Sequence, residues 1–228
     1  MTAALTQILA AFQSSAPISA INFHNTPATR ASEYDRELGI LAEHFSSATE
    51  DDLAYFFKTG SWRHKKPGLI IALYNGYRNN YDVFYPLLEK HGLTWWFFAA
   101  SAYASCSPKD QPAFAARNVL RTIPGEYVDG RTAMDWDELR DLDRRHVVAS
   151  HTRNHATISV DDVKAMENEI VGSQDDFRTG LGHPVKSFAW LWKGTYGESP
   201  LTDACLDRAG YEFLFSSSKI QRLPLRDQ

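Results

Sequence analysis

The sequence predicts an α/β fold in which β-strands and α-helices alternate from one end of the chain to the other. Short apolar segments, typical of buried strands, are separated by longer segments in which apolar residues recur at helical spacing. One segment, 94–100 (TWWFFAA), is almost entirely apolar, which suits a central strand of a parallel sheet. This order predicts βα units with right-handed crossovers around a parallel sheet or barrel.

In the first half of the chain, strands and helices are bounded by recognisable signals. Thr49 precedes an acidic first turn, and Gly60 ends the same helix. A later helix stops at His91-Gly92. The predicted strands and helices of this half cover, in chain order, 18–23, 32–46, 47–60, 69–73, 81–90 and 94–100.

The second half continues the pattern after a segment, 101–133, that is predicted to be rich in loops. The strands that follow are short and apolar, and the longest helix carries an apolar stripe at Val163, Met166, Ile170 and Phe177. No internal repeat or linker divides the chain, so a single domain over 1–228 is predicted. The predicted strands and helices cover 135–145, 147–150, 159–182, 186–192, 199–210 and 211–217.

The composition excludes some classes of partner. The net charge of -4 leaves no basic surface for nucleic acid, and no apolar segment is long enough to span a membrane. The first 15 residues have a mild apolar stripe but no basic residue, so they are interpreted as a surface helix rather than a secretory signal. Cys106 and Cys205 have no metal or redox spacing and are interpreted as free thiols. A cytoplasmic location is therefore expected, whereas the oligomeric state stays open.

Three strand ends carry side chains that could do chemistry. Parallel strands place their reactive groups at their carboxyl ends, and here these ends hold Tyr74-Asn75-Gly76, His151 to His155, and Trp190 to Gly194. We expect these groups to meet at one mouth of the fold.

His151 and His155 are four residues apart just after a buried strand. In a helical turn this spacing would place both imidazoles on one side, where they could share a divalent ion at about 2.0–2.1 Å. The alternative is a pair of solvent-facing loop histidines, and the residues alone leave both open. A third ligand would have to come from a neighbouring strand end, where the sequence offers Asn75.

Four stretches, in order, resemble the polysaccharide deacetylases, that is, the NodB-homology domain of carbohydrate esterase family 4. LIIALYNGYRNNYDVFYPLLEKHGLTWWFFA resembles the family's strand, T-F-D-D-G-Y, helix and A-T-F-F-V strand. MDWDELRDLDRRHVVASHTRNHATIS resembles its W-x-x-L-x-x-L helix and S-H-T-x-x-H. The other two, EIVGSQDDFRTGLGHPVKSFAWLWKG and RAGYEFLFS, resemble the L-G-x-x-V-x-x-F-A-Y-P-Y-G segment and the last strand.

The resemblance implies an irregular (β/α) barrel of the NodB type and a divalent metal, zinc above all. It places the metal histidines on His151 and His155, the metal carboxylate on Asn75 and the general base on Tyr74. It places the oxyanion segment and substrate contacts on Trp190, Trp192 and Gly194, with Leu191 where the family has proline. No histidine follows that segment as a proton donor, because the last one in the chain is His183.

The two departures at the first motif remove charge from the site. Asn75 offers a neutral amide oxygen, a poor ligand for zinc, so the metal is expected to be weakly held or absent. Tyr74 is a phenol with an ordinary pKa near 10, which makes it a proton donor at neutral pH and not a base. Asp82 or another carboxylate could replace the base, but the sequence places none. Trp190 and Trp192 could equally contact a sugar ring or belong to the core.

Three functions therefore stay open. The first is metal-dependent hydrolysis of N-acetyl groups on a sugar or polysaccharide, with the catalytic Asp-Asp pair replaced by Tyr74-Asn75. The second is a catalytically inactive relative, a pseudoenzyme, that binds carbohydrate or a protein partner in the former active-site cleft. The third is a structural paralogue that supports an active deacetylase.

Overall fold

The computed structural model describes residues 17–157, 162–191, 194–217 and 219–224. Within these ranges eight strands form one sheet in the order β1-β3-β4-β5-β6-β7-β8, with β2 paired to β3. The strands are β1 (Ile18–Phe23), β2 (Ser46–Ser47), β3 (Gly68–Asn75), β4 (Trp96–Ala99), β5 (Val147–Ser150), β6 (Ser187–Ala189), β7 (Phe213–Phe215) and β8 (Ile220–Arg222).

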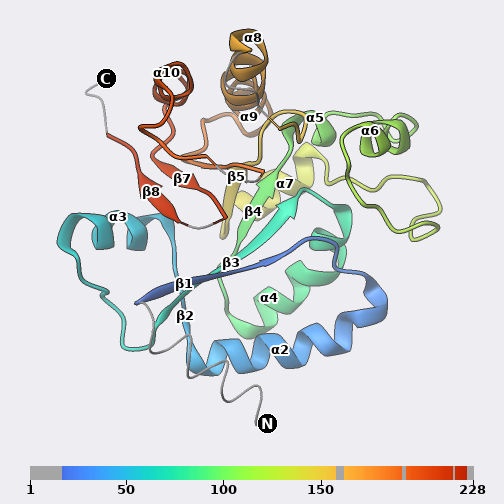
Figure 1. The fold of residues 1–228 in the computed structure, drawn as a ribbon. Helices are drawn as coiled ribbons and strands as arrows, with labels where there is room; N and C mark the ends of the chain where they lie inside the picture. The colour runs from blue at the N-terminus through green and yellow to red at the C-terminus, as the bar shows by residue number, and fades with distance from the viewer. Residues whose placement is uncertain (1–16, 158–161, 192–193, 218, 225–228) are drawn as a thin grey trace.

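Every pairing in the sheet is parallel except the last one, between β7 and β8. The sheet is curled into a half-barrel whose two edges are β1 and β8 (Figure 1). The predicted α/β fold and the barrel of the NodB type are thus confirmed.

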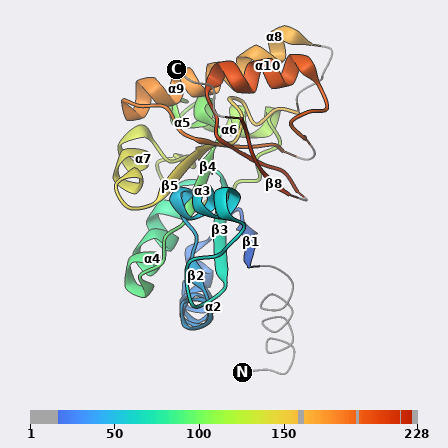
Figure 2. The ribbon, with the colours of Figure 1, turned by 90° about the vertical axis from the view of Figure 1, so that its left-hand side faces the viewer.

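Helices cover the outside of the sheet, with α2 and α4 on one side in Figure 1 and α8, α9 and α10 on the other. Their order along the chain is the alternation that the sequence predicts, and Figure 2 shows the same layers from a second direction. The helical segments are η1 (Ala28–Arg30), α2 (Ala31–His44), α3 (Glu50–Thr59), η2 (Asn80–Phe84), α4 (Tyr85–His91), α5 (Ser101–Ala104), α6 (Gln111–Arg117), α7 (Trp136–Asp143), α8 (Val163–Met166), η3 (Glu167–Val171), α9 (Gly172–Leu181) and α10 (Pro200–Ala209).

The helix α3 shows how local sequence fixes a helix end. The Thr49 hydroxyl accepts the backbone N–H of Asp52 at 3.2 Å, and the Asp52 carboxylate accepts the backbone N–H of Thr49 at 2.9 Å. Gly60 ends the helix in the left-handed conformation, with φ of 70°. The predicted start and stop signals of this helix are confirmed.

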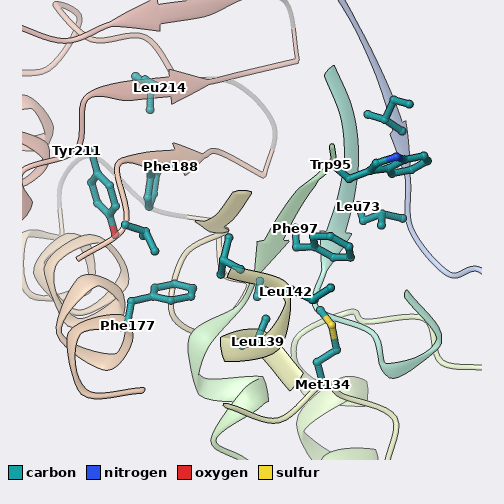
Figure 3. Close-up of a cluster of buried hydrophobic side chains, with 14 of the residues drawn as sticks. Leu73, Trp95, Phe97, Met134, Leu139, Leu142, Phe177, Phe188, Tyr211 and Leu214 are labelled. Atoms are coloured by element: carbon teal, nitrogen blue, oxygen red, sulfur yellow. The ribbon is translucent and has the colours of Figure 1, made fainter. Parts of the chain in front are cut away.

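Alternation along the strands divides the apolar side chains between two buried clusters. The outer cluster lies between the sheet and its helices and includes Leu73, Trp95 and Phe97 (Figure 3). The inner cluster fills the concave side of the sheet and includes Trp96 and Phe98. The expectation that Trp95 and Trp96 face opposite ways is confirmed, because neighbouring strand residues point to opposite faces.

The structure corrects several predicted elements. The segment 101–133, predicted to be loop-rich, contains α5 and α6. The strand ending at 217 is not the final one, since β8 follows it as an antiparallel edge. The long helix is interrupted by the π-helical segment η3, and Val163 is 42% exposed although it was placed on the apolar stripe. The first 15 residues, predicted to be a surface helix, and the start of the predicted helix 159–182 (159–161) lie outside the described residues.

Both cysteines are free thiols, and no helix in the described ranges has the length and apolarity that a membrane crossing requires.

Candidate functional site

Three histidines and a tyrosine meet at the carboxyl ends of the strands, where a parallel sheet exposes its reactive groups. Tyr74 is on β3, and His151 follows β5. Their rings are in an edge-to-face contact with 4.9 Å between centroids, and the His151 and His155 rings are 5.2 Å apart. The structure thus brings together Tyr74, His151 and His155 as the sequence predicts.

Each of the two metal-ligand candidates has one ring nitrogen fixed by the backbone. Nδ1 of His151 donates to the carbonyl oxygen of Ala189 at 3.0 Å, and Nδ1 of His155 donates to that of Asn118 at 2.9 Å. A carbonyl can only accept, so Nδ1 carries the proton, and Nε2 is left with a lone pair. Metal-binding histidines are typically oriented in this way.

Burial keeps both imidazoles neutral. Desolvation, with a smaller contribution from the neighbouring His155, lowers the pKa of His151 to about 3. Desolvation also lowers the pKa of His155. Both Nε2 atoms are therefore unprotonated at neutral pH and available as ligands or hydrogen-bond acceptors.

The prediction that a helical turn brings His151 and His155 together is wrong. Residues 151–155 form no helical turn, and Thr152 and His155 both have positive φ, of 63° and 57°. The turn is instead held from outside, because the buried Glu169 accepts the backbone N–H of Asn154 at 2.8 Å and its side-chain amide at 2.6 Å. The neighbouring Arg153 is ion-paired with Asp176 at 2.9 Å.

Tyr74 faces the concave side of the sheet and lies flat against Phe98, with 4.9 Å between ring centroids and 11° between planes. Burial raises the pKa of its phenol to about 12. The position that the resemblance assigns to a base is therefore occupied by a group that keeps its proton.

Asn75 is the last residue of β3 and is buried with a φ of 81°. Its Nδ2 donates to the hydroxyl of Tyr77 at 3.1 Å, and that hydroxyl also accepts the backbone N–H of Arg121 at 2.9 Å. In contrast, Asn75 Oδ1 is buried and has no hydrogen-bond partner in the described part of the chain. Buried polar atoms are normally paired, so this oxygen points to a missing partner.

His24 is a site residue that sequence reasoning missed. It directly follows β1, lines the same pocket as Tyr74 and His151, and stacks on Tyr74 with 5.7 Å between ring centroids. The residue is exposed, but partial desolvation by its neighbours lowers its pKa. Asn80 fixes its backbone by donating to the carbonyl of His24 at 2.7 Å. The signal was present in the sequence, because His24 stands at the carboxyl end of a parallel strand just as Tyr74 does.

Of the predicted oxyanion segment, Trp190, Leu191 and Gly194 are described, whereas Trp192 lies outside the described residues. Trp190 contacts Phe188 edge-to-face at 5.0 Å between centroids, and it also lines the pocket. A Cβ on Gly194 would lie only 2.4 Å from the indole of Trp190, so this position needs glycine for close packing. Trp190 thus contacts both the outer core and the pocket.

The pocket at this mouth has a volume of about 570 Å³. No carboxylate is found among the described residues that line it. Asp82, the proposed substitute base, is paired with Arg78 at 2.9 Å and does not line the pocket. His183 lies on the surface and is paired with Asp143 at 2.7 Å. No acidic side chain among the described residues lines this pocket, although Glu169 lies close enough to His155 to raise its pKa slightly against the effect of burial.

A divalent ion of the kind that the resemblance implies can be tested against these donors. Among the described residues, no three His, Cys, Asp or Glu side chains are grouped so that they could hold a metal ion. The two free imidazole nitrogens and the unpartnered amide oxygen of Asn75 are nevertheless ligand atoms that such ions accept. These residues thus supply the types of ligand atom that a divalent metal binds, but none of them carries a negative charge.

Comparisons with known proteins agree with this architecture. A family model described as polysaccharide deacetylase matches residues 63–204. No curated protein matches the chain.

Among solved structures, the de-N-acetylase from Aggregatibacter actinomycetemcomitans is 13% identical with a TM-score of 0.65, covering 90% of this chain and 90% of that chain. The Streptococcus pyogenes deacetylase PplD in complex with acetate is 12% identical with a TM-score of 0.63, covering 86% and 80%. IcaB from Ammonifex degensii is 15% identical with a TM-score of 0.63, covering 87% and 83%. At these identities the structures show a shared fold.

Proposed function

Because the chain belongs to the polysaccharide deacetylase family, we propose that its mouth binds an N-acylated sugar, with N-acetyl as the simplest case. The observation that carries the proposal is the pair of His151 and His155, neutral and oriented by backbone carbonyls. His151 lies next to Tyr74 in a pocket of about 570 Å³, and the His155 ring is 5.2 Å from that of His151. A pocket of this size with a few convergent polar groups is typical of a small-ligand site.

His151 and His155 would hold a divalent metal through Nε2, with Asn75 Oδ1 as the third ligand. A bound divalent ion of this kind polarises an amide carbonyl and makes water more acidic. The ligand set is neutral where the family has a carboxylate, so we propose that the metal is held weakly, with zinc the first candidate.

The chain's own side chains would act mainly as donors and positioning groups. The Tyr74 hydroxyl keeps its proton and can donate a hydrogen bond to the oxygen of the scissile amide. His24 is neutral, and its ring can accept a proton from water or return one to the leaving amine nitrogen. With its lowered pKa, His24 is a weak base, and no carboxylate among the described residues that line the pocket could take the first proton instead. General-base catalysis contributes about 10²–10⁴-fold. We therefore propose that hydrolysis is slow.

The alternative function is binding without turnover, and the absence of a carboxylate from the described pocket lining favours it. In that case Trp190 and Tyr74 would present aromatic faces to a sugar ring, or the cleft would receive a protein partner. The shape of the site is kept in both cases, and only the chemistry differs.

The test is acetate release from N-acetylated chito-oligosaccharides, together with calorimetric binding of the same ligands. The parent protein is compared with His151→Ala/His155→Ala and with the surface control His183→Ala. We expect slow release that the double substitution abolishes and the control leaves unchanged. Binding without release would support the inactive alternative. No binding at millimolar concentration, where even weak sugar sites are detected, would overturn both.

A further inference from the structure

The turn that directly follows α6 contacts residues from both strand ends of the candidate site. At its start, the Asn118 carbonyl accepts the Nδ1 proton of His155 at 2.9 Å. At its end, the backbone N–H of Arg121 donates to the Tyr77 hydroxyl at 2.9 Å. The same hydroxyl accepts Nδ2 of Asn75 at 3.1 Å. One turn thus holds a histidine that follows β5 and, through a single phenol, the amide at the end of β3.

The backbone of this turn has a conformation that its sequence does not favour. Val119 has a φ of 56°, in the left-handed region that β-branched residues rarely adopt, and it is 75% exposed. Packing of the valine side chain therefore does not explain the conformation. This φ orients the planar peptide group that carries the Asn118 carbonyl, and Leu120 anchors the turn in the buried cluster that contains Tyr77. Strain of this kind persists where the surrounding contacts fix a functional geometry.

The Tyr77 hydroxyl determines which atom of the Asn75 amide is left free. An amide has a donor end and an acceptor end, and only its oxygen can bind a cation. Because the phenol oxygen accepts Nδ2, Oδ1 is the amide atom that has no partner among the described residues. A carboxylate would not need this control, since both of its oxygens are acceptors. The orientation matters here because the chain has an asparagine at position 75.

We propose that Tyr77 is a positioning residue that keeps the Asn75 oxygen available to a divalent ion, while the same turn keeps His155 in place. The inference rests on the proposed function, because it concerns the metal ligands that we propose there. It adds a residue that does not line the pocket and would touch neither the metal nor the substrate. Tyr77 is suited to this role because it is 2% exposed and its backbone is bridged to Ala133, so the position of its hydroxyl is fixed.

The test compares the loss of this hydroxyl in two backgrounds. Zinc dissociation constants are measured by competition with a chromophoric chelator for the parent, Tyr77→Phe, Asn75→Asp and the double variant. We expect Tyr77→Phe to weaken zinc binding about tenfold when residue 75 is asparagine, because the amide can then reverse. When residue 75 is aspartate, either oxygen can bind zinc, so the same change should weaken binding by less than about twofold.

A purely structural role for Tyr77 would give a different pattern. Loss of affinity by the same factor in both backgrounds, or no loss in either, would overturn the inference. Tyr103→Phe is the matched control, because Tyr103 is buried in the same cluster but its hydroxyl is hydrogen-bonded to Thr132. We expect this control to leave zinc affinity unchanged in both backgrounds.

A measurement on the parent alone covers the case in which Tyr77→Phe does not fold. A crystal structure of the parent grown with millimolar zinc should show Asn75 bound to zinc through Oδ1, with Nδ2 still donating to the Tyr77 hydroxyl. Zinc bound by the histidines without Asn75, or an amide turned away from Tyr77, would overturn the inference.

These measurements also separate the inference from the proposed function. They need no turnover, so the expected zinc affinities would support the role of Tyr77 even in a protein that releases no acetate. Zinc binding that depends on His151 and His155 but not on Tyr77 would overturn the inference alone. No zinc binding by the parent at millimolar concentration would overturn both the inference and the proposed metal site.

Discussion

The ends of β3 and β5 lie two strands apart in the sheet, since Asn75 is paired with Ala99 of β4 and Ala99 with Ser150 of β5. At the β5 end, the ring Nδ1 atoms of His151 and His155 are fixed by carbonyls, and Glu169 holds the turn between them. At the β3 end, the Asn75 amide oxygen has no partner among the described residues, and the Tyr74 phenol keeps its proton.

This difference separates two properties of an active site. The orientation of the two histidine side chains depends on many contacts with the backbone and with the helices behind the turn. At the β5 end these contacts are present, so the side chains are held in place. Ionisation depends on one or two side chains, and β3 ends in a phenol and an amide at the two positions where the sequence resemblance implies carboxylates. The geometry of the mouth can therefore be preserved while its capacity for acid-base chemistry is reduced.

Restoring the charges at β3 should have the largest effect. In Tyr74→Asp/Asn75→Asp, a base and a charged metal ligand return to a mouth that already orients the histidines. We expect acetate release from chito-oligosaccharides to rise by about 10²–10⁴-fold in the presence of zinc. The control is Tyr74→Asn, which gives the same size of side chain at 74 without charge. Equal rates in the parent and the double variant would show that the β3 end is already competent.

A carboxylate at position 75 alone, in Asn75→Asp, should change the zinc content of the purified protein more than the rate of acetate release. We expect the parent, purified without chelator, to hold substoichiometric zinc, and Asn75→Asp to hold close to one equivalent. Asn22→Asp adds the same charge elsewhere in the lining of the pocket and serves as the control. Elemental analysis measures the content. A full equivalent in the parent would mean that the histidines and the amide suffice.

A weaker hold on the turn after β5 should have a smaller effect, which is seen in the affinity for zinc. Glu169→Gln removes the charge that accepts two hydrogen bonds from Asn154, so the turn that carries His155 is held less firmly. We expect zinc affinity to fall about tenfold, the lower range for residues that orient ligands. Glu167→Gln, on the same helical segment but paired at the surface with Arg208, is the matched control. Identical affinities would show that the turn does not depend on Glu169.

Much of the fold could be predicted from the sequence because its signals are local. The strand 18–23, the capping signals of α3 and the opposite orientation of Trp95 and Trp96 all follow from spacing within a few residues. The interruption of the helix over 163–181 and the antiparallel β8 could not be predicted, because they depend on partners far away in the chain.

The site was predictable in part for the same reason. Tyr74, Asn75 and the two histidines stand at strand ends, and strand ends are visible in a sequence. His24 also stands at a strand end, but only its contact with Tyr74 on the neighbouring strand identifies it as a site residue. The left-handed turn at Thr152 could not be read either, since Glu169 and Asp176 stabilise it from a distant segment.

The smallest effect concerns the pKa of Tyr74, on which the contrast between the two strand ends depends. Burial raises this pKa to about 12, above the value near 10 expected in the unfolded chain. The folded state therefore favours the protonated phenol. This contribution is fully present below pH 10 and is lost as the pH rises toward 12. Tyr74→Phe should change the free energy of unfolding by less than about 0.5 kcal/mol at pH 7.

Above pH 10 the parent should lose stability relative to Tyr74→Phe, because only the parent has this phenol to ionise on unfolding. Denaturant unfolding at a series of pH values measures the difference, and ultraviolet difference spectra of parent minus variant follow the phenolate. Tyr55→Phe, which removes a hydroxyl from an exposed tyrosine that does not line the pocket, is the control for the loss of one phenol. A phenolate signal from Tyr74 near pH 8 would mean that the β3 end still carries an ionisable base, and the contrast with the β5 end would fail.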